Sequence, residues 1–290
     1  MSPVRIYMVP GLLCASALAC LVGCRSGQHV DSEKLSVEAQ TPAQTTPATQ
    51  VQKVPTSVMV DIPAGSFMMG GQPHDSDALP VREVFVSRFS IGKYEVTVRQ
   101  YKACEADGAC TRPVKTSDDV DVFNYGGEDR DLHPINGVTW EQARDYCRWE
   151  NKRLPTEAEW EKAARGADRR KYPWGDDLPS CKYTVMHGEY PGCNTMLTSK
   201  VGRKQGDVSP YGVHDMAGNV AEWVQDWYNP KYYTSSPTRD PTGPETGSKR
   251  ATRGAGYYSG PERMNIGARN FAKPDEANAE IGFRCAMSLE

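Results

Sequence analysis

Nine cysteines constrain what this chain of 290 residues can fold into. Three lie within the first 24 residues, and the other six are spread between Cys104 and Cys285. An even number of cysteines in an exported protein indicates disulfide bonds. The compartment in which the chain folds therefore decides how these six residues are interpreted.

The first 23 residues have the features of a secretory signal. Arg5 precedes an apolar run over residues 6–22, and a small residue stands before Cys24. The tetrad LVGC at 21–24 resembles the bacterial lipobox, whose cysteine becomes the first mature residue and carries the lipid. We predict a signal peptide over 1–23 and lipidation of Cys24. A transmembrane anchor is the alternative, because a run of about 17 residues lies at the lower end of the spanning range.

Residues 24–57 read as a lipidated cysteine followed by a flexible tether. The segment is rich in Thr, Pro, Ala and Gln, and such a composition cannot bury enough apolar surface to fold. No aspartate follows Cys24, which favours the outer membrane over retention at the inner one. We expect an exported lipoprotein, held to the membrane by its N-terminal lipid, with its domain on the periplasmic or surface face.

Residues 58–290 provide enough chain for one domain. Hydrophobic residues make up 38% of the sequence, and the net charge of −3 gives no reason to expect a nucleic-acid partner. Residues 84–86 and 89–91 are predicted as a strand or hairpin. Capping boxes, in which a Thr is followed three residues later by Gln or Glu, predict helices after Thr97, Thr139 and Thr156. The last hundred residues indicate short strands and irregular structure, so we expect an α+β fold with little regular structure.

Six cysteines allow fifteen disulfide pairings. Cys104 and Cys110 flank a turn-like segment, and Cys181 and Cys193 enclose a loop of eleven residues. We predict these two local bonds, with free or differently paired thiols as the alternative at each.

Several segments match one family in order. They are IPAGSFMMG (62–70), FSIGKYEVTVRQYKAC (89–104), RLPTEAEWEKAARG (153–166), SPYGVHDMAGNVAEWVQDWY (209–228), RATRGAGYY (250–258) and GFRCA (282–286). The chain resembles the formylglycine-generating enzyme, or sulfatase-modifying factor, family over essentially all of 58–290. The resemblance implies a variant of the C-type lectin-like fold, and it pairs Cys147 with Cys285. With the two local bonds, this gives a domain stapled by disulfides.

The family enzyme oxidises a cysteine to formylglycine, using O₂ and a copper(I) ion held by two cysteines. Soft thiolates suit Cu(I), whereas hydroxyls and carboxylates do not. The matching interval, GYYSGPERMNIGAR at 256–269, contains no cysteine. The first family cysteine falls on or near Ser259, and the second has no assignable counterpart. We therefore expect no copper and assign no catalytic residue.

The family also binds calcium near its GNVWEW-like motif. By resemblance, the ligands would be the Asp215 side chain, the Gly218 and Val220 carbonyls, and Glu222. Oxygen ligands of this kind suit Ca²⁺. The alternative is that the two acids cap turns or pair with arginine.

Aromatic residues fall in segments that wall the peptide cleft of the family. Trp223, Tyr257, Tyr258 and Arg269 are candidate cleft residues, because aromatic walls suit extended peptides. Core packing is the alternative for the aromatic residues, and a structural ion pair is the alternative for Arg269.

Three functions compete. The first is a non-catalytic module that binds a peptide or protein in the cell envelope or helps to assemble a complex there. The second is a metal-dependent oxidoreductase of altered chemistry in the same cleft, although His133, His187 and His214 show no spacing typical of an iron site. Formylglycine generation on sulfatases is the third and the least favoured.

Overall fold

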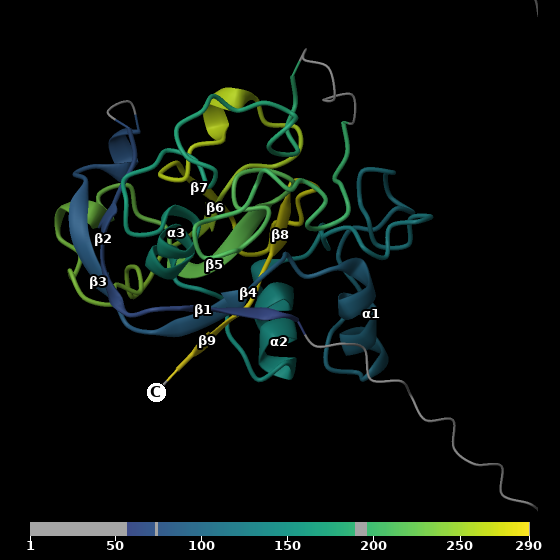
Figure 1. The fold of residues 1–290 in the computed structure, drawn as a ribbon. Helices are drawn as coiled ribbons and strands as arrows, with labels where there is room; N and C mark the ends of the chain where they lie inside the picture. The colour runs from purple at the N-terminus through teal and green to yellow at the C-terminus, as the bar shows by residue number, and fades with distance from the viewer. Residues whose placement is uncertain (1–56, 73–74, 189–195, 290) are drawn as a thin grey trace, which may run out of the picture. The chain divides into compact units, whose positions relative to one another are not determined.

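A computed structural model describes residues 57–72, 75–188 and 196–289. The signal, Cys24 and almost all of the tether lie outside this range. Three small sheets and three short helices are joined by long irregular segments (Figure 1). No helix among the described residues is both long and apolar enough to span a bilayer.

The nine strands form three sheets of different size. The first sheet has the order β1-β4-β9, the second pairs β2 with β3, and the third has the order β7-β6-β5-β8. All strand pairs are antiparallel except β5 with β8. The bounds are β1 Met59–Ile62, β2 Gly65–Met69, β3 Arg82–Val86, β4 Phe89–Gly92, β5 Ala221–Trp227, β6 Arg250–Arg253, β7 Arg269–Ala272, β8 Ile281–Phe283 and β9 Ala286–Ser288.

The two segments predicted as a strand or hairpin are two strands that belong to different sheets. β3 pairs with β2, whereas β4 pairs with β1 and β9. The hairpin alternative is therefore wrong. A chain passing from one sheet to another can show the same alternation of residues as a hairpin, because alternation reports burial and not the identity of the partner strand.

All three predicted helices form where the capping boxes place them. They are α1 Val98–Ala106, α2 Trp140–Trp149 and α3 Glu157–Arg165. In each helix the Thr side chain accepts from the third backbone N–H, and the Gln or Glu side chain accepts from the Thr N–H. α3 ends at Arg165, where Gly166 takes a positive φ of 78° that favours glycine.

Every residue of α3 is buried, although five of the nine are charged. Trp160 and the alanines pack in the apolar core with Phe67, Val84 and Ile91. The Lys162 ammonium is held by the carbonyls of Pro63, Gly65 and Val86, at 2.6–3.2 Å. Burying these charges is tolerable only because each has a partner.

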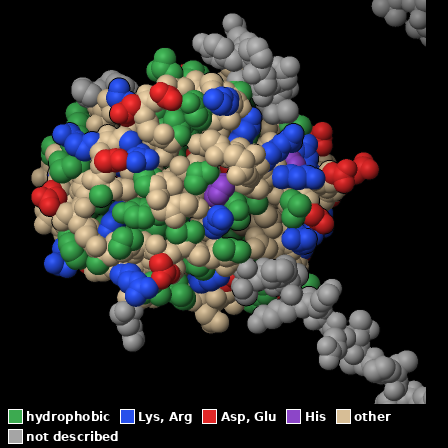
Figure 2. Space-filling view, in the orientation of Figure 1, with side chains coloured by type: hydrophobic (Ala, Val, Ile, Leu, Met, Phe, Trp, Pro, Cys, Tyr) green, Lys and Arg blue, Asp and Glu red, His purple; other side chains and the backbone are tan. Residues whose placement is uncertain are grey.

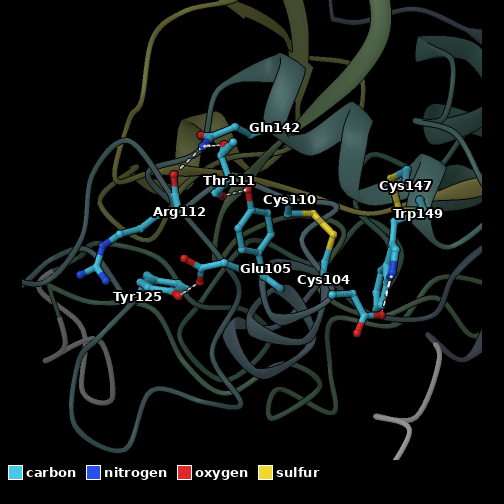
Figure 3. Close-up of a disulfide and its surroundings, with 12 residues drawn as sticks. Cys104, Glu105, Cys110, Thr111, Arg112, Tyr125, Gln142, Cys147 and Trp149 are labelled. Atoms are coloured by element: carbon cyan, nitrogen blue, oxygen red, sulfur yellow. Dashed lines mark hydrogen bonds between the residues drawn. A yellow bond between two sulfur atoms is a disulfide. The ribbon is translucent and has the colours of Figure 1, made fainter.

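Two disulfides lie in an apolar cluster that includes Tyr101, Tyr146 and Phe283. Cys104–Cys110 closes the end of α1, beside the hydrogen bonds from Tyr125 to Glu105 and from Trp149 to Asp107 (Figure 3). Cys147–Cys285 joins α2 to the chain between β8 and β9. The predicted bonds Cys104–Cys110 and Cys147–Cys285 are confirmed. Cys181 is also disulfide-bonded, and its predicted partner Cys193 lies outside the described residues.

Candidate functional site

Ser259 lies on or near the position where the sequence analysis expects the first family cysteine. It follows β6 and precedes the short helix Pro261–Arg263. Its hydroxyl donates a long hydrogen bond of 3.4 Å to Glu280, and its carbonyl accepts from the His187 N–H at 2.9 Å. Burial raises the pKa of Glu280. A neutral hydroxyl beside a carboxyl supplies hard oxygen atoms, which are poor ligands for Cu(I).

The described part of the chain offers no free thiol to replace the missing pair. Each of its five cysteines is disulfide-bonded. Met264, in the same interval, is 1% exposed and packs with Met186 and Ala255. A buried thioether therefore occupies part of the interval.

The four candidate cleft residues do not form one open wall. Trp223 is 0% exposed, and its indole donates to the Val138 carbonyl within the core. Tyr257 is 4% exposed, whereas Tyr258 is 50% exposed and stacks on the His187 ring at 5.0 Å. Trp223 is therefore a core residue, and only Tyr258 presents a ring to solvent. Sequence could not separate the two roles, because both place an aromatic residue on a strand or its extension.

Arg269, the fourth candidate cleft residue, is buried and does not line an open cleft. It is 6% exposed, and its guanidinium forms a bidentate pair with Glu157, at 2.7 and 2.9 Å. Arg253 binds the same carboxylate at 3.0 Å and Glu161 at 2.7 Å. Burial alone would raise the pKa of Glu157, but Arg269 and Arg253 hold it below its usual value. These arginines therefore belong to a structural ion-pair network that fixes α3 against β6 and β7.

The segment that leads into β5 contains the residues proposed as calcium ligands. Asp215 is buried, and one of its oxygens accepts from the Gly202 N–H. Gly218 packs directly on Thr184 and Val185, where any Cβ would collide with the Val185 carbonyl. Burial first, and then the neighbouring Asp207, raise the pKa of Asp215 to about 7. The local fold thus brings buried carboxyl groups close together without enough neighbouring cations to balance their charge.

Glu222 fits the predicted ligand set only in part. Its Oε2 accepts from Arg284 and from the Trp160 indole, at 2.7 and 3.0 Å, while Oε1 accepts from Arg284 alone, at 2.7 Å. A carboxylate oxygen has two lone pairs, so Oε1 keeps the capacity for one further contact. No group of three or more His, Cys, Asp or Glu side chains in the described ranges has the arrangement of a metal site. A calcium ion here would therefore depend on the backbone carbonyls.

Sequence reasoning missed two sets of side chains near this region. Glu95 is buried, and it accepts from the Asn219 side chain at 2.6 Å and from the Val220 N–H at 3.2 Å. Burial first, then Asp215 and Glu222, raise its pKa. The second set is a group of cations around His133, signalled by the run KVGRK at 200–204.

On the face shown in Figure 2, apolar side chains form several small groups separated by polar and charged side chains. The recesses among the described residues are small or mixed in character. One of about 110 Å³ is lined by Thr184, Ser199, Arg203 and Lys204 among others. Small apolar groups of this kind are normal for a protein surface.

Comparison with known proteins settles the family. The sulfatase-modifying factor enzyme 1-like domain matches residues 43–289. This chain belongs to the sulfatase-modifying factor family. The Thermomonospora curvata protein named formylglycine-generating enzyme is 34% identical, over 79% of this chain and 92% of that one. A Bos taurus protein named inactive C-alpha-formylglycine-generating enzyme 2 is 28% identical, over 79% of this chain and 87% of that one.

Solved structures agree on the fold. The structure titled PvdO from Pseudomonas aeruginosa is 28% identical, with a TM-score of 0.66, and covers 80% of this chain and 94% of its own. The α+β fold with limited regular structure is therefore the fold of this family, as expected, and in this chain two disulfides staple it. The family includes proteins named as active and as inactive, so membership alone does not decide activity.

Proposed function

We propose that this chain is an envelope lipoprotein whose sulfatase-modifying-factor-like domain binds a peptide or protein, without making formylglycine. The observation that carries the proposal is that the interval 256–269, where we expect the family cysteines, contains no cysteine. Without two thiolates the domain lacks the ligand set that the reaction requires for Cu(I). The scaffold around that interval is retained.

A direct assay tests the loss of formylglycine generation. The full chain would be incubated with a Cys-X-Pro-X-Arg peptide, copper and O₂, with the T. curvata enzyme as the positive control. We expect mass spectrometry to show that the peptide keeps the mass of its cysteine form and contains no aldehyde. Aldehyde formed at a rate comparable with the control would overturn the proposal.

The binding role is tested in the envelope. Cross-linking in cells, followed by solubilisation and affinity purification, should recover one partner in proportion to the bait. A protein that purifies alone after cross-linking would contradict the proposal.

Mass spectrometry of the mature N-terminus should find diacylglycerol on Cys24, and Cys24→Ala should move the protein out of the membrane fraction.

A metal-dependent oxidoreductase is the second candidate. It is favoured only by the retained scaffold and by the open position of the Ser259 hydroxyl beside Glu280. Elemental analysis of the purified protein separates the two functions. Stoichiometric iron or copper would favour the enzyme, and calcium alone would favour the binding module.

We also propose that Ca²⁺ binds at the segment leading into β5. Asp215 would supply a side-chain oxygen, Gly218 and Val220 their carbonyls, and Glu222 the free lone pair of Oε1. Support comes from buried acids that outnumber the single Arg284 among them. Saturating Ca²⁺ should raise the melting temperature relative to chelator, because it binds only the folded state. Asp215→Asn should abolish this difference, and the exposed Asp275→Asn should keep it; equal melting temperatures in wild-type protein would refute the site.

A further inference from the structure

Three cations, Arg130, Lys200 and Arg203, lie close enough to His133 to disfavour its charged form, and Lys204 lies beside Arg203. We call these four cations the basic cluster. Arg130 Nη1 lies 3.3 Å from His133 Nδ1, and Lys200 and Arg203 are exposed.

The positive charge of the basic cluster has no partner within the described residues. None of the four cations forms an ion pair with a carboxylate there. Asp131, which follows Arg130, pairs with Lys102 instead, at 2.7 Å. The Lys204 ammonium donates to the carbonyl of Cys181. Like charges held close together destabilise the free protein, unless an anion joins them.

The fold holds together the two chain segments that carry the basic cluster, residues 130–133 and 198–204. The Val201 N–H donates to the Leu132 carbonyl at 3.0 Å. The Thr198 hydroxyl contacts His133 Nδ1 at 2.8 Å and Asn124 Oδ1 at 3.2 Å. These contacts position the cations before any ligand arrives, and such preorganisation favours binding.

One residue links the basic cluster to the segment that contains Ser259. The Asn219 side chain accepts from the Ser199 N–H at 2.8 Å, and its carbonyl accepts from the Tyr257 N–H at 2.8 Å. Arg130 also lies close enough to Tyr257 to lower the pKa of its hydroxyl, against the larger effect of burial. The basic cluster therefore adjoins the segment that contains Tyr257 and Ser259.

We propose that the basic cluster forms one end of the peptide site and selects a segment rich in Asp or Glu. This inference rests on the proposed function. Carboxylates would receive charge-assisted hydrogen bonds from the guanidinium and ammonium groups and relieve their mutual repulsion. A small recess of about 110 Å³, lined by Ser199 and Arg203 among others, adjoins the basic cluster. An anionic membrane would instead favour a broad basic face with exposed apolar residues around it, whereas Arg130 and Lys204 are half-buried.

Selection from a random peptide library tests the inference. The full chain would be compared with the variant Lys200→Glu/Arg203→Glu, which changes two exposed side chains, and with Lys231→Glu as an exposed control outside the cluster. Peptides selected by the wild type and by the control should be enriched in Asp and Glu. Their affinity for the double variant should fall about tenfold at low salt, and the loss should shrink as salt screens the charges.

The outcomes separate the inference from the function beneath it. Enriched peptides without acidic bias would overturn the inference and leave the binding function standing. No enrichment of any peptide would contradict both. Binding to phosphatidylglycerol vesicles in preference to phosphatidylcholine, lost in the double variant and without acidic peptide selection, would assign the basic cluster to the membrane and overturn the inference.

A second measurement reports on the cluster directly. NMR titration of the His133 ring should give a low pKa in the free protein, because burial and then Arg130, Lys200 and Arg203 disfavour its charged form. A selected acidic peptide should raise this pKa, since its carboxylates offset those cations. An unchanged His133 pKa in the saturated complex would place the peptide elsewhere.

Discussion

At the scale of single residues, buried charge decides how the domain is held together. Arg253 forms ion pairs with both Glu157 and Glu161, and Arg269 forms another with Glu157. None of these four side chains is more than 6% exposed. A buried ion pair adds little over an apolar core, but removal of one partner leaves an uncompensated charge. The network therefore enforces one arrangement of α3 against the third sheet.

Glu157→Gln should destabilise the domain by about 3–5 kcal/mol, because Arg253 and Arg269 would share a neutral amide in place of a carboxylate. Urea unfolding would measure the change. Lys102→Gln, which breaks an exposed pair with Asp131, is the matched control and should change the free energy of unfolding far less. Equal effects of both substitutions would contradict the structural role of the network.

The pH dependence of stability should carry the signature of His133. Burial, with Arg130, Lys200 and Arg203, lowers its folded-state pKa to about 4 from 6.5. Between these values the unfolded chain binds a proton that the folded chain does not, so stability falls as pH drops from about 6.5 to about 4. His133→Gln should flatten this part of the curve of unfolding free energy against pH. His187→Gln, at an exposed position, should leave it as steep, and a curve unaffected by His133→Gln would argue against the assignment.

At the scale of elements, the helices were predictable and the pairing of strands was not. A capping box lies within four consecutive residues, so its hydrogen bonds depend on local sequence alone. All three boxes form. β3 and β4 are adjacent in sequence yet join different sheets, because β3 pairs with the preceding strand β2 whereas β4 pairs with β1 and with the distant C-terminal strand β9.

Thr139→Ala should destabilise the domain by about 1 kcal/mol, because the helix loses the side-chain acceptor for the Gln142 N–H. Thermal or urea unfolding would measure the loss. Thr139→Ser keeps the hydroxyl and should retain most of the stability. A serine variant as unstable as the alanine variant would show that the methyl group matters more than the cap.

At the scale of the whole molecule, the disulfides close loops of very different length. Cys104 and Cys110 are six residues apart, whereas Cys147 and Cys285 are separated by 138. The longer bond joins α2 to the C-terminal strands, so it closes a much larger loop in the unfolded chain.

Replacing Cys147 and Cys285 by alanine should therefore cost more stability than replacing Cys104 and Cys110. The loop-entropy relation gives about 5 kcal/mol for the long loop and about 2 kcal/mol for the short one. Unfolding of the two double variants in urea would compare them. A larger loss for the short loop would indicate that local packing at the end of α1 outweighs loop entropy.

The candidate site was only partly predictable, as Trp223, Arg269 and Ser259 show. The absence of a cysteine from residues 256–269 is a fact of sequence, so the prediction that the thiolate ligands are lost needs no structure. The burial of Trp223 and the pairing of Arg269 with Glu157 depend on chain segments more than 80 residues away. No local pattern encodes such partners.

The sequence by itself determined the family, the helix starts and the lack of the thiol pair, because each depends on residue identity or on short spacing. Only the tertiary structure decided which charges are buried pairs, which aromatic rings face solvent, and that the cations near His133 adjoin the Tyr257 segment. Those properties arise from contacts between distant segments, where burial changes the energy of a charge far more than its neighbours in sequence do.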